Sequence, residues 1–124
     1  MVDTSGLAWR PDAGSAIAAN AAETMARQAA SFLDASVHDE IDGARVGVSR
    51  IMATADGGHV YAGSVVVGPL RAYLATVAGP AGRVAHKYIV SYPDIESART
   101  ALDAALARQE RQGYALIGTV DGEA

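Results

Sequence analysis

The most regular hydrophobic pattern lies near the end of the chain, between residues 94 and 112. Apolar side chains there recur at spacings of three and four residues, which is typical of one face of an amphipathic helix. These side chains are Ile95, Ala98, Leu102, Ala105 and Leu106. Asp94 is a favourable N-cap residue, and Gly113 stands where helices commonly end in the left-handed conformation. The pattern therefore predicts a helix over residues 94–112.

A second helical pattern covers residues 15–35, where apolar residues recur at every fourth position. The stripe consists of Ile17, Ala21, Met25, Ala29 and Leu33, and the alanines that flank it are Ala18, Ala22, Ala26 and Ala30. The high helix propensity of alanine accounts for most of the flanking residues. The polar stretch from His38 to Asp42 is predicted to be a solvated loop that ends at Gly43. Adjacent residues on such a loop point apart, so they are not expected to bind a metal ion.

The middle of the chain alternates β-prone segments with turn signals. The segments cover residues 45–54, 59–67, 70–78 and 84–92. Turns rich in glycine or proline separate them, because glycine accepts positive φ and proline cannot donate into a sheet ladder. The alternation in the first segment slips near Arg50, as a bulge would cause. Consecutive strands joined by tight turns are most simply antiparallel neighbours, and residues 114–120 add a fifth strand.

Together these elements predict one α+β domain over residues 1–124, in the order α-β-β-β-β-α-β. The sheet is expected to be mainly antiparallel, with four to five strands. Both helices are expected to pack on one face of it, which leaves the other face exposed or covered by a partner. Residues 1–12 are an N-terminal arm without periodicity, and residues 121–124 are a tail.

Composition and charge narrow the classes of function. The net charge is −4 at pH 7, which argues against a protein that mainly binds the nucleic acid backbone. The absence of cysteine excludes disulfides, thiolate metal sites and a cysteine nucleophile. No apolar run is long enough to span a membrane, and no basic segment precedes a hydrophobic one at the start. The sequence predicts a soluble cytoplasmic protein or virion component that has no secretion signal and no membrane partner.

The spacings that accompany catalysis and cofactor binding are missing from the sequence. No Gly-x-Ser-x-Gly turn accompanies the three histidines, which are His38, His59 and His86. The glycine pairs lie between predicted strands rather than ahead of a helix, so hairpin turns explain them better than a phosphate-binding loop. We therefore predict no catalytic residue, no metal site and no cofactor, and favour a non-enzymatic protein.

One set of side chains suggests a binding surface. By strand alternation, Tyr61 lies on one side of its strand, Arg71 and Tyr73 share a side of the next, and His86 and Tyr88 share a side of the last. If the strand registers align, the tyrosines and His86 line one sheet face, with Arg71 near its edge. Such a face suits a protein partner, a flat ligand or single-stranded nucleic acid. Tyrosine is also an ordinary half-buried sheet residue, which is the alternative interpretation.

Trp9 is the only tryptophan of the chain and lies in the arm. An exposed indole would leave a large apolar surface in water. We therefore predict that Trp9 is mostly buried, either on its own domain or against a neighbouring subunit, and include it among the candidate binding residues.

The segment from Lys87 to Gly113 resembles the end of the Trp-Gly-Arg domain found in poly(ADP-ribose) polymerases. The resemblance rests on a strand, the motif Asp94-Ile95-Glu96-x-Ala98, an apolar-striped helix and a closing Gln112-Gly113-Tyr114. It covers only the last third of the chain. The defining Trp-Gly-Arg is missing, because the third strand and its turn contain Leu74 to Gly79 instead. The chain is therefore not assigned to that family.

The leading hypothesis is a non-enzymatic interaction or assembly module. It would be a subunit of a homo-oligomer or of a larger complex, such as a phage or bacterial machine of the tail-completion or connector type. One alternative is a small ligand-binding domain or enzyme in which His86 is the acid or base, Arg71 orients an anion and Tyr73 or Tyr88 donates a hydrogen bond. A second alternative is a nucleic-acid-binding module, which requires the basic residues of the meander to cluster on one surface. These residues are Arg45, Arg50, Arg71, Arg83 and Lys87.

Overall fold

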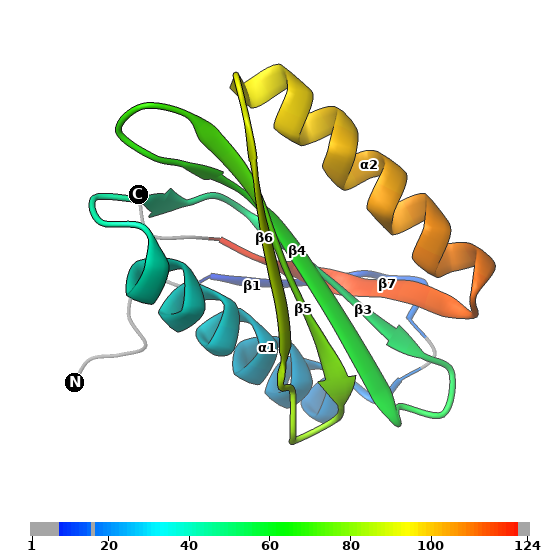
Figure 1. Ribbon diagram of the computed structural model, residues 1–124. Helices are drawn as coiled ribbons and strands as arrows, with labels where there is room; N and C mark the ends of the chain where they lie inside the picture. The colour runs from blue at the N-terminus through cyan, green and yellow to red at the C-terminus, as the bar shows by residue number, and fades with distance from the viewer. Residues whose placement is uncertain (1–7, 16, 122–124) are drawn as a thin grey trace.

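The computed structural model describes residues 8–15 and 17–121. This part of the chain folds into two helices and seven strands (Figure 1). The helices are α1 (Ala19–Glu40) and α2 (Ile95–Arg111). The strands are β1 (Trp9–Pro11), β2 (Arg45–Val46), β3 (Ser49–Thr54), β4 (His59–Val67), β5 (Ala72–Pro80), β6 (His86–Tyr92) and β7 (Tyr114–Val120). The α+β class is confirmed, and the element order matches the predicted one apart from the short strands β1 and β2.

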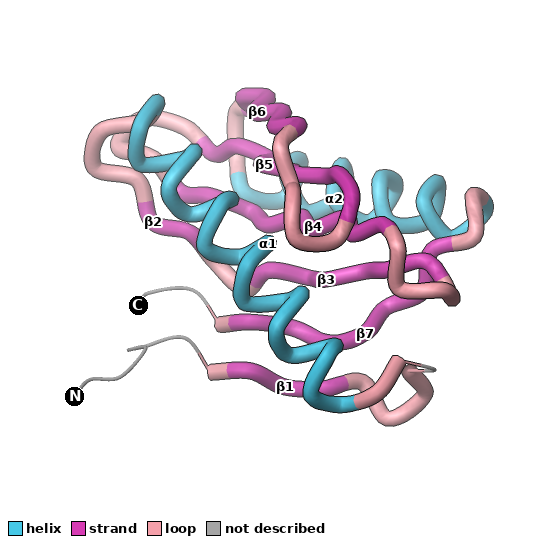
Figure 2. Tube along the Cα trace, turned by 90° about the horizontal axis from the view of Figure 1, so that it is seen from below, coloured by secondary structure: helices cyan, strands magenta, loops and turns pink. Residues whose placement is uncertain are grey.

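All the paired strands are antiparallel and form one sheet in the order β1-β7-β3-β4-β5-β6, with β2 paired to β4. Strands β3 to β6 follow the chain as the predicted meander. After α2, the chain returns to the opposite side of β3 and forms β7, and β1 then pairs with β7. Segments from the two ends of the described chain therefore lie side by side at one edge of the sheet (Figure 2).

The sheet lies between the two helices, which contradicts the prediction that both pack on one face (Figures 1 and 2). Ala62 and Val77 belong to the core cluster that contains the buried side of α1. Leu74, from the opposite side of β5, packs with Leu102 of α2. The prediction fails because the central strands are apolar on both sides, so each helix can cover a different face. The structure is therefore a three-layer arrangement of helix, sheet and helix.

Helix α1 begins and ends later than the predicted range of 15–35. The Ser15 hydroxyl accepts a hydrogen bond of 3.2 Å from the Ile17 amide, and no side chain of the described residues caps the helix at Ala18. At the other end, the helix continues through His38 to Glu40, so most of the predicted polar loop is helical. Three of the flanking alanines are buried against the sheet, so they contribute packing as well as helix propensity. These are Ala22, Ala26 and Ala30.

Helix α2 agrees with its sequence signals. The Asp94 carboxylate accepts a hydrogen bond of 2.8 Å from the Ser97 amide, as the N-cap assignment requires. Gly113 follows the helix with a φ of 96°, which is the left-handed conformation expected there. Under the middle of the helix, a Cβ added to Gly63 would lie 2.8 Å from a methyl carbon of Leu102. The absence of a side chain at Gly63 therefore lets α2 approach the sheet.

The cap of α2 predicts how stability depends on pH. The hydrogen bond from Ser97 favours the charged carboxylate and lowers the pKa of Asp94 below its ordinary value of 3.8. A lowered folded-state pKa stabilises the fold above the ordinary value, and this stabilisation is lost as the pH falls through the folded-state pKa. Asp94→Asn keeps a capping oxygen but cannot ionise. We therefore expect its unfolding temperature to fall less steeply at acidic pH than that of the wild type. Thermal unfolding followed by circular dichroism between neutral pH and about pH 2 measures this. Asp103→Asn, which removes a carboxylate from the same helix but no capping bond, is the control, and an equal change in both variants contradicts the prediction.

The first predicted strand, 45–54, is interrupted and forms β2 and β3. The Gly47 amide donates a hydrogen bond of 2.9 Å to the Val65 carbonyl oxygen at the interruption. Further along, the pairing of β3 with β7 shifts register between Ile51 and Met52. The expected irregularity near Arg50 is thus present, one residue further along in the pairing with β7.

The described part of the N-terminal arm, residues 8–12, folds back on its own domain. Trp9 pairs with Val120, and Arg10 forms an ion pair of 3.0 Å with Asp121. Trp9 is partly buried and packs against the core cluster on the α1 side of the sheet. Its environment agrees with the first of the two expected arrangements. Of the predicted tail, 121–124, only Asp121 is described; residues 122–124 and the first seven residues of the arm lie outside the described residues.

Candidate functional site

The strand register separates the tyrosines that were expected to share one sheet face. Tyr61 of β4 pairs with Ala78 of β5, which pairs with His86 of β6, so Tyr61 and His86 lie on the α2 side. Tyr73 pairs with Val66, a member of the α1 core cluster, and therefore lies on the opposite side. The surface proposed from strand alternation is not formed as a single face.

Tyr61 is buried beneath the end of α2. Its ring contacts the ring of Tyr114 edge to face, with 6.3 Å between the centroids. Burial raises the pKa of the Tyr61 hydroxyl, and the hydrogen bond with Thr76 and the positive charge of Arg108 oppose this effect. Because only 8% of the residue is exposed, Tyr61 is part of the core rather than of an accessible surface.

The remaining candidates divide between the two sides of the outer strands. Arg71 donates a hydrogen bond of 3.3 Å to the Ser91 hydroxyl, and Tyr73 packs against the α1 core. On the α2 side, His86 is exposed and 68% of Tyr88 is exposed. The structure therefore keeps only His86 and Tyr88 together on an accessible surface, and both belong to β6.

Strand β6 is the outer strand of the sheet and pairs only with β5 among the described residues. Its seven residues, His86–Tyr92, are all exposed or partly exposed. None is proline, and the pairing with β5 runs through all seven without a shift. The one residue that is charged at neutral pH, Lys87, forms an ion pair of 2.9 Å with Glu40 of α1. The free backbone groups of such an edge are a template for another strand.

The opposite edge of the sheet is protected. Strand β1 is only three residues long and ends at Pro11, which has no amide hydrogen to donate. Its central residue, Arg10, places a charge at the edge and pairs with Asp121. Short length and proline are features by which natural sheets prevent edge pairing, and β6 has neither, although each edge strand carries one ion-paired charge, Arg10 or Lys87. The contrast identifies β6 as the edge available to a partner.

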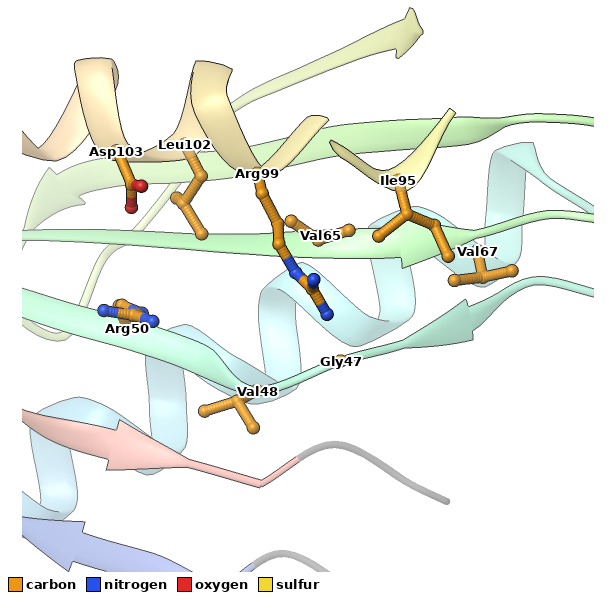
Figure 3. A pocket seen from close by; sticks show the side chains of 9 residues that line it. All are labelled: Gly47, Val48, Arg50, Val65, Val67, Ile95, Arg99, Leu102 and Asp103. Atoms are coloured by element: carbon orange, nitrogen blue, oxygen red, sulfur yellow. The ribbon is translucent and has the colours of Figure 1, made fainter. Parts of the chain in front are cut away.

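A second accessible feature is a groove between α2 and the strands beneath it (Figure 3). Its volume is about 360 Å³. Val65 and Val67 of β4 form its floor, and the other walls come from α2 and from the interruption between β2 and β3. The lining residues are Gly47, Val48, Arg50, Val65, Val67, Ile95, Arg99, Leu102 and Asp103.

Sequence reasoning missed this groove. It placed Arg50 in the first β-prone segment and drew no inference about function from Arg99 or Asp103. Val48 and Ile95 are apolar but 47% and 40% exposed. This exposure could not be inferred without the position of α2 over the sheet. No local spacing signals the groove, because its walls come from segments distant in the sequence.

Other classes of site receive no support from the described residues. Within residues 8–15 and 17–121, no group of three or more His, Asp or Glu side chains is placed to hold a metal ion. Neither described helix is both long enough and apolar enough to cross a membrane. No protein-family model, curated protein or solved structure matches this chain.

Proposed function

We propose that the protein is a non-enzymatic assembly module that associates with a second copy of itself through strand β6. The open, unprotected edge of β6 is the observation that supports this function. Pairing two copies of β6 would continue the antiparallel sheet from one subunit into the next. The expected place in a larger phage or bacterial assembly stays a prediction.

The sequence of β6 is compatible with pairing to itself. A two-fold axis at Ile89 pairs all seven residues and places Lys87 opposite Ser91 of the second copy. It also places Tyr88 opposite Val90, and aromatic and β-branched pairs of this kind stabilise antiparallel sheets. No like charges face each other in this register. The strand is therefore self-complementary, which favours a second copy over an unrelated partner.

Substitutions at Ser91 test both the interface and its register. In the dimer, position 91 of each copy faces Lys87 of the other copy. Ser91→Lys therefore creates two pairs of like charges, whereas Ser91→Glu creates two pairs of opposite charges. With about 0.2–1 kcal/mol for each cross-strand pair, we expect Ser91→Lys to raise the dimer Kd by up to about thirtyfold. Ser91→Glu should lower the Kd or leave it unchanged. Ser91→Lys loses the hydrogen bond from Arg71, whereas a glutamate carboxylate can still accept it, so Ser91→Ala, which loses the bond without adding a charge, is the control. Sedimentation velocity over a range of concentrations measures the Kd.

Hydrogen exchange distinguishes β6 from any other contact surface. In a dimer joined through β6, backbone amides of residues 86–92 that do not bond to β5 should become protected as the concentration rises. A monomer at all concentrations contradicts self-association. A dimer whose β6 amides remain unprotected contradicts the proposed interface.

A further inference from the structure

The groove beside α2 combines an apolar floor with two guanidinium groups that have no partner among the described residues. Neither Arg50 nor Arg99 forms a hydrogen bond or ion pair with the part of the chain that the structure describes. Both residues are exposed and line the groove. From this arrangement we propose that the groove binds a carboxylate joined to an apolar chain.

The charges of the groove favour an anion. Arg99 extends from α2 across the groove toward Gly47 and Val48, while Asp103 lies toward the end that holds Arg50 (Figure 3). Two positive groups and one negative group leave a net positive charge along the lining. A guanidinium binds a carboxylate through two parallel hydrogen bonds, which gives a directed and comparatively strong contact.

The apolar side chains of the lining are at the end of the groove that Arg99 reaches (Figure 3). Val48 and Ile95 are large exposed hydrophobic residues, and Val67 is partly exposed between the groove and a second hollow under the β4–β5 turn. An aliphatic chain attached to the bound carboxylate would cover these side chains and remove apolar surface from water. The volume of the groove, about 360 Å³, is within the range of small-molecule sites.

The site does not depend on the proposed function. The groove lies over β3, β4 and the interruption that precedes β3, whereas the proposed subunit contact lies at β6, beyond β5 in the sheet. Binding in the groove and pairing at β6 can therefore succeed or fail separately.

Titration of the full chain with octanoate tests the proposal. Two-dimensional NMR of the backbone amides should show saturable shifts at Gly47, Val48 and Arg99, while butyrate, with a shorter chain, should bind more weakly. Octanamide, which is a neutral analogue of the same shape, should produce no saturable shifts. N-acetyl-leucine distinguishes the source of the carboxylate, because stronger binding than octanoate indicates the end of a polypeptide and weaker binding indicates a free aliphatic acid.

Variants of the two arginines test the assignment of the charges. Arg99→Gln should weaken octanoate binding by about tenfold or more, since hydrogen bonds to charged groups are the stronger class. Arg99→Lys, which keeps the charge without the fork of donors, should weaken it less. Arg111→Gln, at the other end of the same helix, is the matched control and should leave the affinity unchanged. Absence of saturable binding of both octanoate and N-acetyl-leucine, equal binding of octanamide and octanoate, or equal losses in Arg99→Gln and Arg111→Gln would overturn the proposal. The comparison of octanoate, butyrate and octanamide on the wild type needs no variant.

Discussion

Replacing Leu33 with alanine is expected to lower the free energy of unfolding by about 2–5 kcal/mol. Leu33 lies in the middle of the inward side of α1 and is completely buried against the sheet. Its neighbours on that side include Ala29 and Ala30, whose short side chains cannot extend to fill the space left by the missing atoms. The loss therefore includes both the transfer of apolar atoms and the cost of a cavity.

Chemical denaturation of Leu33→Ala and of Leu70→Ala measures this effect with the same change of side chain in both variants. Leu70, in the turn between β4 and β5, is 94% exposed, so its truncation should change the stability by less than about 0.5 kcal/mol. Similar losses in the two variants would show that α1 does not pack as described.

A methyl group at position 118 is expected to detach the N-terminal arm. A Cβ added to Gly118 would lie 2.5 Å from the Arg10 carbonyl oxygen and would also overlap the Trp9 ring. The φ of Gly118, 155°, is moreover a conformation that other residues rarely adopt. We expect Gly118→Ala to lower the free energy of unfolding by about 2–4 kcal/mol through strain and lost packing of β1.

The indole provides a direct readout, because Trp9 is the only tryptophan. Its fluorescence emission should shift to longer wavelength in Gly118→Ala, as the ring becomes exposed to water. Gly82→Ala is the control: Gly82 also has positive φ, at 82°, but an added Cβ meets no atom within 4 Å. It should lower the stability by about 1 kcal/mol without changing the emission. Unchanged emission in Gly118→Ala contradicts the described contact between the arm and β7.

The elements that sequence reasoning located best are those defined by local signals. Helix α2 has its cap, its apolar stripe and its terminal glycine within twenty residues, and strand β4 matches its predicted range because turn residues bound it on both sides. The start of α1 was misplaced because Ser15, a favourable cap residue, forms a local turn with Ile17 instead.

The candidate surface failed for a different reason, which is strand register. Alternation correctly grouped the residues within each strand, but it cannot relate one strand to the next. In the structure, odd-numbered residues of β4 share a face with even-numbered residues of β5. A shift of one residue in the connecting turn would have placed Tyr73 on the side of Tyr61. The groove could not be predicted from the sequence either, because Arg50 and Arg99 line the same groove only through the packing of α2 on the sheet.

The position of β7 has a consequence for the order in which the chain assembles. This strand lies between β1 and β3, although it is synthesised more than one hundred residues after β1. The meander of β3 to β6 can form through pairing of consecutive strands, and contacts close in sequence generally form early. Until residues 114–120 leave the ribosome, however, Trp9 has no strand to pair with and β3 keeps an open edge. Closure of that edge therefore waits for β7, and the segment that holds Trp9, although it is synthesised early, is the last part of the described fold that can be secured.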